Sequence, residues 1–409
     1  MDTGTTAWLL TSSALVLFMT PGLALFYGGM VRGKNVLAML MKNYIAMGVV
    51  TITWIAIGCS LAFSGNATIG DWSVVGNLDL WGIRDVGLGN EIFGIDAPDL
   101  TFVSFQMMFA IITPALIAGA VAERIKFTAW VAFIAVWSIV VYSPMAHWVW
   151  GGGFIATEVQ ALDFAGGLVV HINAGAAALA LVMVLGKRAG WRRDAILPHA
   201  PALTLLGAGI LWLGWFGFNA GSALAADGLA ANAFITTQIA AAVAATTWCV
   251  VEIMRNGKPT TIGIASGAVA GLVAITPAAG FVSPLSAVVI GVAAGAICFY
   301  ALQLKFQFDF DDSLDVVAVH LVGGIIGALL LGLLAEERIG GVDGLFFGNP
   351  EQFLRQIISV VIAIVWAFGI SYVLAKIIDA TIGLRVTEEE EEQGLDLSLH
   401  GEKGYILTD

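Results

Sequence analysis

The segments ALDFAGGLVVHINAG (161–175) and DDSLDVVAVHLVGG (311–324) each place one histidine inside an apolar run. In both segments an aspartate precedes the histidine by eight positions, Asp163 before His171 and Asp312 before His320. A glycine follows each histidine by four positions. An ionisable side chain inside a membrane-spanning helix is a functional residue by default, because its burial in hydrocarbon is costly. If these segments cross a membrane, the two histidines are therefore the first functional candidates.

The composition indicates that these segments do cross a membrane. Hydrophobic residues make up 59% of the 409-residue chain and charged residues 12%, and the mean hydropathy is +0.90. A water-soluble domain needs more polar groups on its surface. Apolar runs of about 20 residues, enough to cross about 30 Å of hydrocarbon, recur along the chain, and the short alternating strands of a barrel are absent from the sequence. The composition predicts an all-α polytopic membrane protein.

Loops and charged residues divide the chain into eleven predicted spans. These are residues 7–31, 36–64, 100–121, 127–147, 161–186, 200–223, 229–254, 260–281, 284–303, 313–334 and 351–382. Residues 1–383 are expected to form the transmembrane domain, and residues 384–409, with the acidic run TEEEEEQ (387–393), a cytoplasmic regulatory tail. Only MDTGTTA precedes the first span, without a basic region or cleavage site, so we expect this span to be retained.

The distribution of Lys and Arg predicts the orientation in the membrane. Loops after odd-numbered spans carry most of these residues, for example RGK (32–34) and KRAGWRR (187–193), whereas loops after even-numbered spans hold only Arg84, Arg338 and Arg355. With an odd number of spans, this asymmetry places the N-terminus outside and the C-terminus in the cytoplasm. A multi-pass protein of the plasma membrane, surrounded by the lipid bilayer, is expected.

The histidine segments also predict an inverted repeat. Span five would run inward and span ten outward, and at about 1.5 Å per residue both histidines fall near the bilayer midplane. The same motif on helices of opposite direction is typical of inverted-topology repeats, whose substrate path lies between the halves. Residues 7–186 and 200–334 would form the two halves, with span eleven (351–382) added.

Two imidazoles near the midplane suit a small neutral solute. Neutral imidazole offers one donor and one acceptor nitrogen, so a bonded pair would present its outer edges to a solute such as ammonia or water. A bare alkali cation prefers rings of oxygens. The alternative is a pair of core histidines bonded across helices. The aspartates open their helices, and capping of free N–H groups is an alternative to a role in polarising a nearby cation.

Aromatic residues collect at the predicted outer ends of spans three, four and six. Around an outer vestibule they would form a cation–π site, although each alone is explained by packing or by the interfacial belt. A nearby serine would add a hydroxyl acceptor. The residues are Phe105, Phe109, Trp148, Trp150, Trp215, Phe218 and Ser222.

At these motifs the sequence resembles the ammonium transporter (Amt/MEP/Rh) family, and its Amt branch in particular, over nearly the whole chain. The resemblance rests on PGLALFYGGMVRGKN (21–35), AER (122–124), AHWVWGGG (146–153), ALDFAGGLVVHINAG (161–175), GKRAG (186–190), GWFGFNAGS (214–222), ITPAAGF (275–281), DDSLDVVAVHLVGG (311–324), GLRV (383–386) and EEEEQGLDLSLHGEKGY (389–405).

The resemblance implies a homotrimer with one pore per subunit and assigns roles to matching residues. Trp150, Phe105 and Ser222 would recruit NH4+ at an outer site, and Phe109 and Phe218 would be the stacked rings that gate the pore below it.

His171 and His320 would line the apolar pore as twin histidines. Asp163, with Asp312 as its counterpart in the second half, would support the site and assist deprotonation. Tyr142, Trp215 and Thr276 would be supporting positions.

The expected function is ammonium transport. NH4+ would lose a proton at the outer site, pass as NH3 and be reprotonated inside. The sequence leaves open whether the proton follows, which makes transport electrogenic, or returns outside, which makes the protein a gas channel. No cofactor is expected, and Cys59, Cys249 and Cys298 lack the spacing of a disulfide framework or metal site.

Three alternatives remain at this point. The first is an ammonium sensor that signals through its tail, with a PII-type signalling protein as the partner that the resemblance implies at the cytoplasmic mouth. The second is an intramembrane enzyme, which the absence of GxSxG, HExxH and paired catalytic aspartates on the spans disfavours. The third is a proton-coupled transporter of another small solute.

Overall fold

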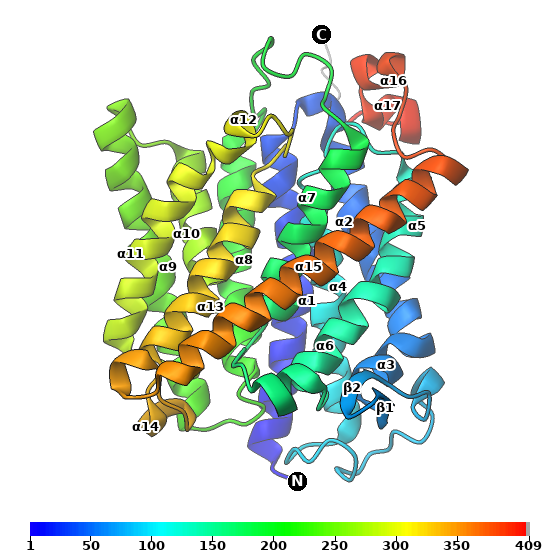
Figure 1. Cartoon of the computed structure of the whole chain (residues 1–409). Coiled ribbons are helices and arrows are strands. Elements are labelled where there is room, and N and C mark those ends of the chain that lie inside the picture. The colour runs from blue at the N-terminus through cyan, green and yellow to red at the C-terminus, as the bar shows by residue number, and fades with distance from the viewer. Residues whose placement is uncertain (406–409) are drawn as a thin grey trace.

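The computed structural model describes residues 1–405, and the last four residues of the predicted tail, 406–409, lie outside the described residues. Long helices run side by side between two faces, with residue 1 at one face and the helices labelled α16 and α17 at the other (Figure 1). The face with residue 1 is called the N-terminal face and the other the C-terminal face. Ten helical segments of the described chain are long and apolar enough to cross a membrane, which confirms the prediction of an all-α membrane protein.

The first half of the chain contains five predicted spans, three of which include a π-helical turn. The elements are α1 (Thr3–Met30), η1 (Gly33–Asn35), α2 (Val36–Thr53), η2 (Trp54–Gly58), α3 (Cys59–Phe63), β1 (Asn66–Ile69), β2 (Trp72–Gly76), η3 (Trp81–Ile83), α4 (Asp99–Ile117), α5 (Phe127–Trp137), η4 (Ser138–Tyr142), α6 (Ser143–Trp150), η5 (Ile155–Val159), η6 (Gly167–Ile172) and α7 (Asn173–Leu185). Strands β1 and β2 form an antiparallel hairpin at the N-terminal face (Figure 1).

The second half repeats the plan, and a long helix and the tail follow it. The elements are α8 (Pro201–Gly221), α9 (Gly228–Asn256), α10 (Thr261–Ile275), α11 (Pro284–Ala301), α12 (Leu304–Gln307), η7 (Val317–Val322), α13 (Gly323–Leu334), α14 (Glu337–Gly340), η8 (Leu345–Phe347), α15 (Pro350–Thr381), α16 (Glu388–Gln393) and α17 (Leu395–His400). Helix α15 crosses the other helices obliquely from one face to the other (Figure 1).

The third helix of each half is shorter than the predicted span. Helix α4 ends at Ile117, and α10 has 15 residues and ends at Ile275, where residues 100–121 and 260–281 were expected. The tetrapeptide ITPA lies near both ends: α10 ends at Ile275, the first residue of ITPA (275–278), whereas α4 contains Pro114 of ITPA (112–115) and ends three residues later, at Ile117. Proline lacks the N–H that would continue the hydrogen-bond ladder and disfavours helical backbone in the residue before it. Pro277 therefore accounts for the end of α10, and the chain turns within the bundle after both helices.

The repeated histidine segments meet through their glycines. Both histidines lie in π-helical turns, η6 and η7, and π-helical turns are frequent at functional sites. A Cβ atom on Gly175 would lie 2.4 Å from the backbone nitrogen of Leu321, and one on Gly324 would lie 2.9 Å from Cγ1 of Ile172. Each glycine thus packs against the residue after the opposite histidine. The two halves can approach closely only because these positions have no side chain.

Candidate functional site

A pocket opens at the N-terminal face among α4, α6 and α8. Its volume is about 280 Å³, and its walls combine aromatic rings with two polar side chains. The lining residues are Phe102, Gln106, Phe109, Val149, Trp150, Phe164, Ser222 and Leu224. The pocket therefore gathers Trp150, Phe109 and Ser222, which the sequence placed on three separate spans.

Hydrogen bonds orient the two predicted binding groups of this pocket. Trp150 Nε1 donates to the backbone carbonyl of Asp163 at 2.9 Å, and the indole lies edge-on to Phe109 with ring centroids 6.0 Å apart. Ser222 Oγ donates to the carbonyl of Phe218 at 2.9 Å. Because the hydroxyl hydrogen is used in this bond, the oxygen presents lone pairs to the pocket. Rings and lone pairs together favour a cation that donates hydrogen bonds.

Phe105 lies beside this pocket rather than among its lining residues. It is 1% exposed and packs edge-on against Phe109, with centroids 4.9 Å apart. Gln106, the next residue, lines the pocket and was missed from the sequence. It is 7% exposed. A polar residue within an apolar span was the available signal.

Two phenyl rings close the floor of the pocket. The centroids of Phe109 and Phe218 are 4.4 Å apart, at an interplanar angle of 45°. Both side chains are 1% exposed. Below them lies a cavity of about 10 Å³, lined by Met19, Leu23, Ile112, Leu116, Val170, His171, Leu211, Trp215, Phe218, Val269 and His320. About one water-sized molecule fits in such a volume.

The two histidines form a pair at this inner cavity. Their Nδ1 atoms are 3.3 Å apart, and the rings lie 5.4 Å apart at 22°. One neutral ring must donate and the other accept in this bond, so one outer nitrogen is an acceptor and the other a donor. Nε2 of His171 has no hydrogen-bond partner among the described residues. The pair therefore offers a small solute one acceptor and one donor.

Trp215 holds the first histidine in place. The indole stacks on His171 with centroids 5.5 Å apart at 20°. Its Nε1 donates to Thr276 Oγ1 at 2.9 Å, and that hydroxyl donates to the carbonyl of Leu272 at 2.7 Å. The structure thus brings Trp215 and Thr276 together with the histidine pair. Tyr142 is buried beside Trp54, at 6.4 Å between centroids, and lines neither cavity.

The aspartates cap the turns that carry the histidines. Asp163 Oδ1 accepts the N–H groups of Gly166 at 2.8 Å and Gly167 at 2.6 Å, and Oδ2 accepts those of Leu168 at 2.7 Å and Val169 at 3.2 Å. Asp312 Oδ2 accepts the N–H of Val317 at 2.7 Å. Both carboxylates thus perform the capping considered from the sequence, and neither is among the lining residues of the N-terminal-face pocket.

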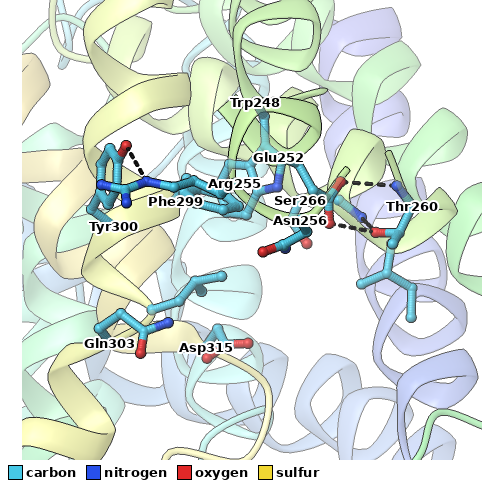
Figure 2. Close-up of a pocket in the computed structure, with 13 residues that line it drawn as sticks. Trp248, Glu252, Arg255, Asn256, Thr260, Ser266, Phe299, Tyr300, Gln303 and Asp315 are labelled. Carbon is cyan, nitrogen blue, oxygen red and sulfur yellow. Dashed lines mark hydrogen bonds between the residues drawn. The ribbon is translucent and has the colours of Figure 1, made fainter. Parts of the chain in front are cut away.

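A third pocket opens at the C-terminal face, with a volume of about 490 Å³. Asn256, Gln303 and Asp315 surround its open centre (Figure 2). Ser266 of its wall lies three residues before Val269 of the inner cavity on α10, about 4.5 Å along the helix axis. Helix α10 therefore contributes to the walls of both cavities, which share no lining residue.

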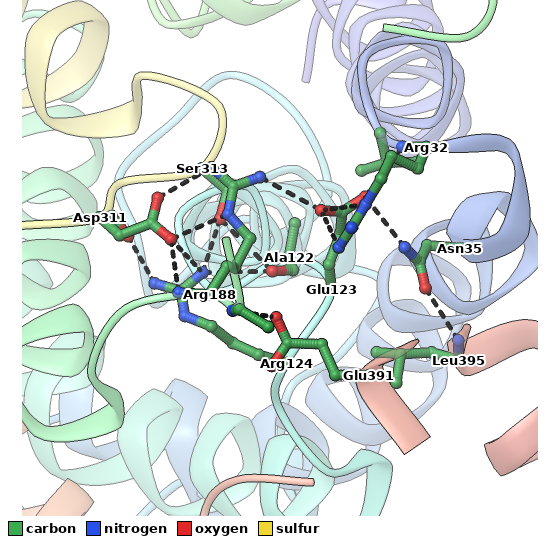
Figure 3. Close-up of polar contacts among 12 residues, drawn as sticks. Arg32, Asn35, Ala122, Glu123, Arg124, Arg188, Asp311, Ser313, Glu391 and Leu395 are labelled. Atoms are coloured by element: carbon green, nitrogen blue, oxygen red, sulfur yellow. Dashed lines mark hydrogen bonds and ion pairs between the residues drawn. The ribbon is translucent and has the colours of Figure 1, made fainter. Parts of the chain in front are cut away.

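Charged side chains join the loops of the C-terminal face (Figure 3). Arg188 donates from Nε and Nη2 to the two carboxylate oxygens of Asp311, each at 2.8 Å, and from Nη1 to Glu123 at 3.2 Å. Glu123 also accepts from Arg32 Nε at 3.0 Å and from Asn35 Nδ2 at 2.9 Å. Burial opposes ionisation of both acids, but Arg188 together with Arg32 at Glu123 and Arg124 at Asp311 outweighs it, so the pKa values of Glu123 and Asp311 lie below their usual range.

The tail docks on this cluster. The N–H of Leu395 donates to Asn35 Oδ1 at 2.8 Å, and Asp396 Oδ1 accepts the N–H of Ala38 at 2.8 Å. Glu391 accepts from Arg385 at 2.7 Å. Within residues 1–405, no group of three or more His, Cys, Asp or Glu side chains is arranged to hold a metal ion.

Comparison with known proteins shows what this chain is similar to. Residues 7–405 match the model of the Ammonium Transporter Family. An ammonium transporter of Mycobacterium tuberculosis is 49% identical over 99% of this chain and 90% of its own length. One from Bacillus subtilis is 46% identical over 99% of both chains. The crystal structure of Candida albicans Mep2 superposes with a TM-score of 0.89 at 35% identity, over 95% of this chain and 88% of that one.

Proposed function

The chain belongs to the ammonium transporter family, in its Amt branch, and we propose that it recruits NH4+ at the N-terminal-face pocket and conducts NH3 past the histidine pair. The observation that carries this proposal is the inner cavity. It has room for about one water-sized molecule, and among apolar walls it presents one donor and one acceptor nitrogen.

Recruitment uses the rings and lone pairs of the outer pocket. Trp150 and Phe109 attract the cation through their π systems, and Ser222 Oγ accepts one of its N–H groups. Phe105 supports the site from behind Phe109. A cation–π contact in such a desolvated site contributes about 2 kcal/mol or more.

The cation loses a proton before it passes Phe109 and Phe218. An isolated monovalent cation costs on the order of tens of kcal/mol to move into an apolar medium, in the idealised Born picture. Ammonium avoids this cost because it can leave a proton behind, whereas potassium cannot. Asp163 supports the step by holding Trp150 and the start of η6.

NH3 then moves along His171 and His320 to the C-terminal-face pocket. The acceptor nitrogen of the pair receives an N–H of ammonia, and the donor nitrogen gives a hydrogen bond to its lone pair. Ammonia is protonated again in the wide polar pocket beyond. We propose that the proton crosses separately, so that net uptake is electrogenic.

The membrane orientation and the partners are part of the same proposal. The N-terminal face is outside and the C-terminal face cytoplasmic, in the plasma membrane, because the basic loops lie on the latter. We further propose a homotrimer with one pore per subunit, and a PII-type signalling protein that closes the C-terminal-face pocket. The mass of the purified complex and a binding assay with such a protein test these two points. The relatives reported above are transporters, so pure sensing is not favoured.

The test is an ammonium concentration jump on the purified protein in liposomes, with current and internal pH recorded together. Current with ammonium and none with potassium is the expected result. Internal alkalinisation above that of bare liposomes, without current, would replace electrogenic transport by an ammonia channel. If neither a current nor a change of internal pH is recorded while ammonium still binds, the result would favour the sensor.

The twin-histidine role is tested by the double substitution His171→Ala and His320→Ala. We expect a folded protein that has lost selective ammonium conduction. The control is His199→Ala, at a histidine that lines none of the three cavities. Unchanged selectivity of ammonium over potassium in the double variant would remove the histidines from the mechanism.

A further inference from the structure

Two glutamines of α15 reach from span eleven to the segment before Asp163. Both side chains are fully buried, with 0% exposure. Gln356 Oε1 accepts the backbone N–H of Leu162 at 2.7 Å, and its Nε2 donates to the Leu162 carbonyl at 2.8 Å. Gln352 Nε2 donates to the carbonyl of Gln160 at 3.3 Å and to Gln356 Oε1 at 3.2 Å. One amide therefore pairs with both backbone groups of one residue.

The paired segment needs such partners because it is not helical. Residues 160–166 lie between η5 and η6, and Gln160 has a positive φ of 58°. At membrane depth, backbone groups outside helices must find partners within the protein. The N–H of Phe164 donates to the carbonyl of Pro277 at 3.0 Å. Gln356 supplies the partners for Leu162, which directly precedes Asp163.

Asp163 connects this pairing to the outer pocket. Its carbonyl accepts the Trp150 indole N–H at 2.9 Å, so the backbone position of residue 163 sets where the ring lies. Its carboxylate accepts four N–H groups at the start of the turn that carries His171. A shift of the Leu162 backbone would therefore displace both the indole and the cap of η6.

We infer that Gln356 is a positioning residue of the outer cation site: span eleven, which lies outside the repeated halves, completes this site by clamping Leu162. The inference rests on the proposed recruitment of ammonium at Trp150. It also explains why α15 carries two fully buried glutamines near its start, where it packs against η5 and η6.

The test compares Gln356→Met with Ser371→Ala. Methionine keeps the volume and removes both hydrogen bonds to Leu162. Ser371 is a matched control on the same helix, because it is also fully buried and accepts a hydrogen bond, from Trp137 Nε1 at 2.9 Å. In liposomes, Gln356→Met is expected to raise the KM for ammonium about tenfold, which corresponds to about 1.4 kcal/mol of binding free energy. We expect Ser371→Ala to leave KM within about twofold of the unsubstituted protein.

A second readout keeps the inference testable apart from transport. Hydrogen exchange of a peptide that covers residues 160–166 should become faster in Gln356→Met and stay unchanged in Ser371→Ala. Unchanged exchange in Gln356→Met would overturn the clamp.

Trp150→Leu separates the proposed clamp from the proposed outer site. If this variant raises KM and Gln356→Met does not, the clamp is wrong and the outer site stands. If Trp150→Leu leaves KM unchanged, the outer site itself is wrong and the clamp's role in it falls too.

Gln356→Glu is the variant that tests the same hydrogen bonds if Gln356→Met does not fold. A protonated glutamic acid has one C=O acceptor and one O–H donor, and can therefore make both bonds to Leu162, whereas a carboxylate can only accept. KM relative to the unsubstituted protein at the same pH should fall towards one as the pH is lowered. A ratio that stays constant and well above one down to acidic pH would contradict the clamp.

Discussion

Replacement of Arg188 by methionine is expected to destabilise the C-terminal face strongly. The guanidinium group is 4% exposed, and the carboxylates of Asp311 and Glu123 that it joins are fully buried. Removal of one partner from a buried ion pair costs about 3–5 kcal/mol. Glu123 would keep Arg32 at 3.0 Å, and Asp311 would keep the more distant Arg124 at 3.9 Å. We therefore expect the lower end, about 3 kcal/mol.

The control is the neighbouring residue, Lys187. Its ion pair with Asp309 is about half exposed, with side chains at 43% and 53%, and solvent screens such surface pairs, so they contribute little to stability. Thermal unfolding in one detergent, followed by tryptophan fluorescence, should show a large fall of the midpoint for Arg188→Met and little change for Lys187→Met. The double variant Arg188→Met with Asp311→Leu should recover part of the loss, because the stranded charge is gone. Equal midpoints for the two single variants would refute the reasoning.

The same cluster predicts how stability depends on pH. Glu123 and Asp311 have pKa values below their usual range in the folded protein. As the pH falls, these acids are therefore protonated in the unfolded chain before they are protonated in the folded protein. The stability that they contribute is present above about pH 4. That contribution is lost as the pH falls through the lower, folded-state values. Asp311→Asn should flatten this acid limb of the unfolding midpoint, and an unchanged limb would count against the cluster.

Three further substitutions test the path and the tail. Phe109→Ala removes one ring of the tilted Phe109–Phe218 pair, whose centroids are 4.4 Å apart, so potassium current should rise above that of the unsubstituted protein in liposomes; an unchanged potassium current would show that the ring is no barrier. Thr276→Val removes the acceptor of Trp215 Nε1 and should slow maximal transport while KM stays the same, whereas a change in KM alone would place Trp215 in recruitment instead. Asn35→Leu removes the acceptor of the Leu395 N–H, so limited proteolysis should cut the tail faster, and an unchanged cleavage rate would contradict this docking contact.

Much of the fold could be predicted from the sequence, because the relevant signals are local. Long apolar runs report the hydrocarbon they must cross, and the paired motifs around His171 and His320 predicted that the segments are related. The charge asymmetry of the loops predicts an orientation by the same local reasoning, and this orientation stays a prediction.

The limits of the spans were less accurate where backbone geometry changes inside the bundle. Helix α4 ends at Ile117 and helix α10 at Ile275, both within runs that remain apolar. Hydropathy cannot detect such an end, since the residues beyond it are still buried. The π-helical turns η6 and η7 leave no hydropathy signal either, because their composition is that of any apolar helix.

The sequence by itself therefore determined the class of protein and the pairing of its histidine segments. Only the tertiary structure placed Phe105 behind Phe109, brought Gln106 to the pocket and joined Gln356 to Leu162. The physical reason is that hydropathy and the spacing of apolar residues are properties of neighbouring residues, whereas a buried amide finds its partner in a distant part of the chain. Which partner it meets depends on how helix α15 is placed against the non-helical segment at Leu162, 194 positions away in the chain.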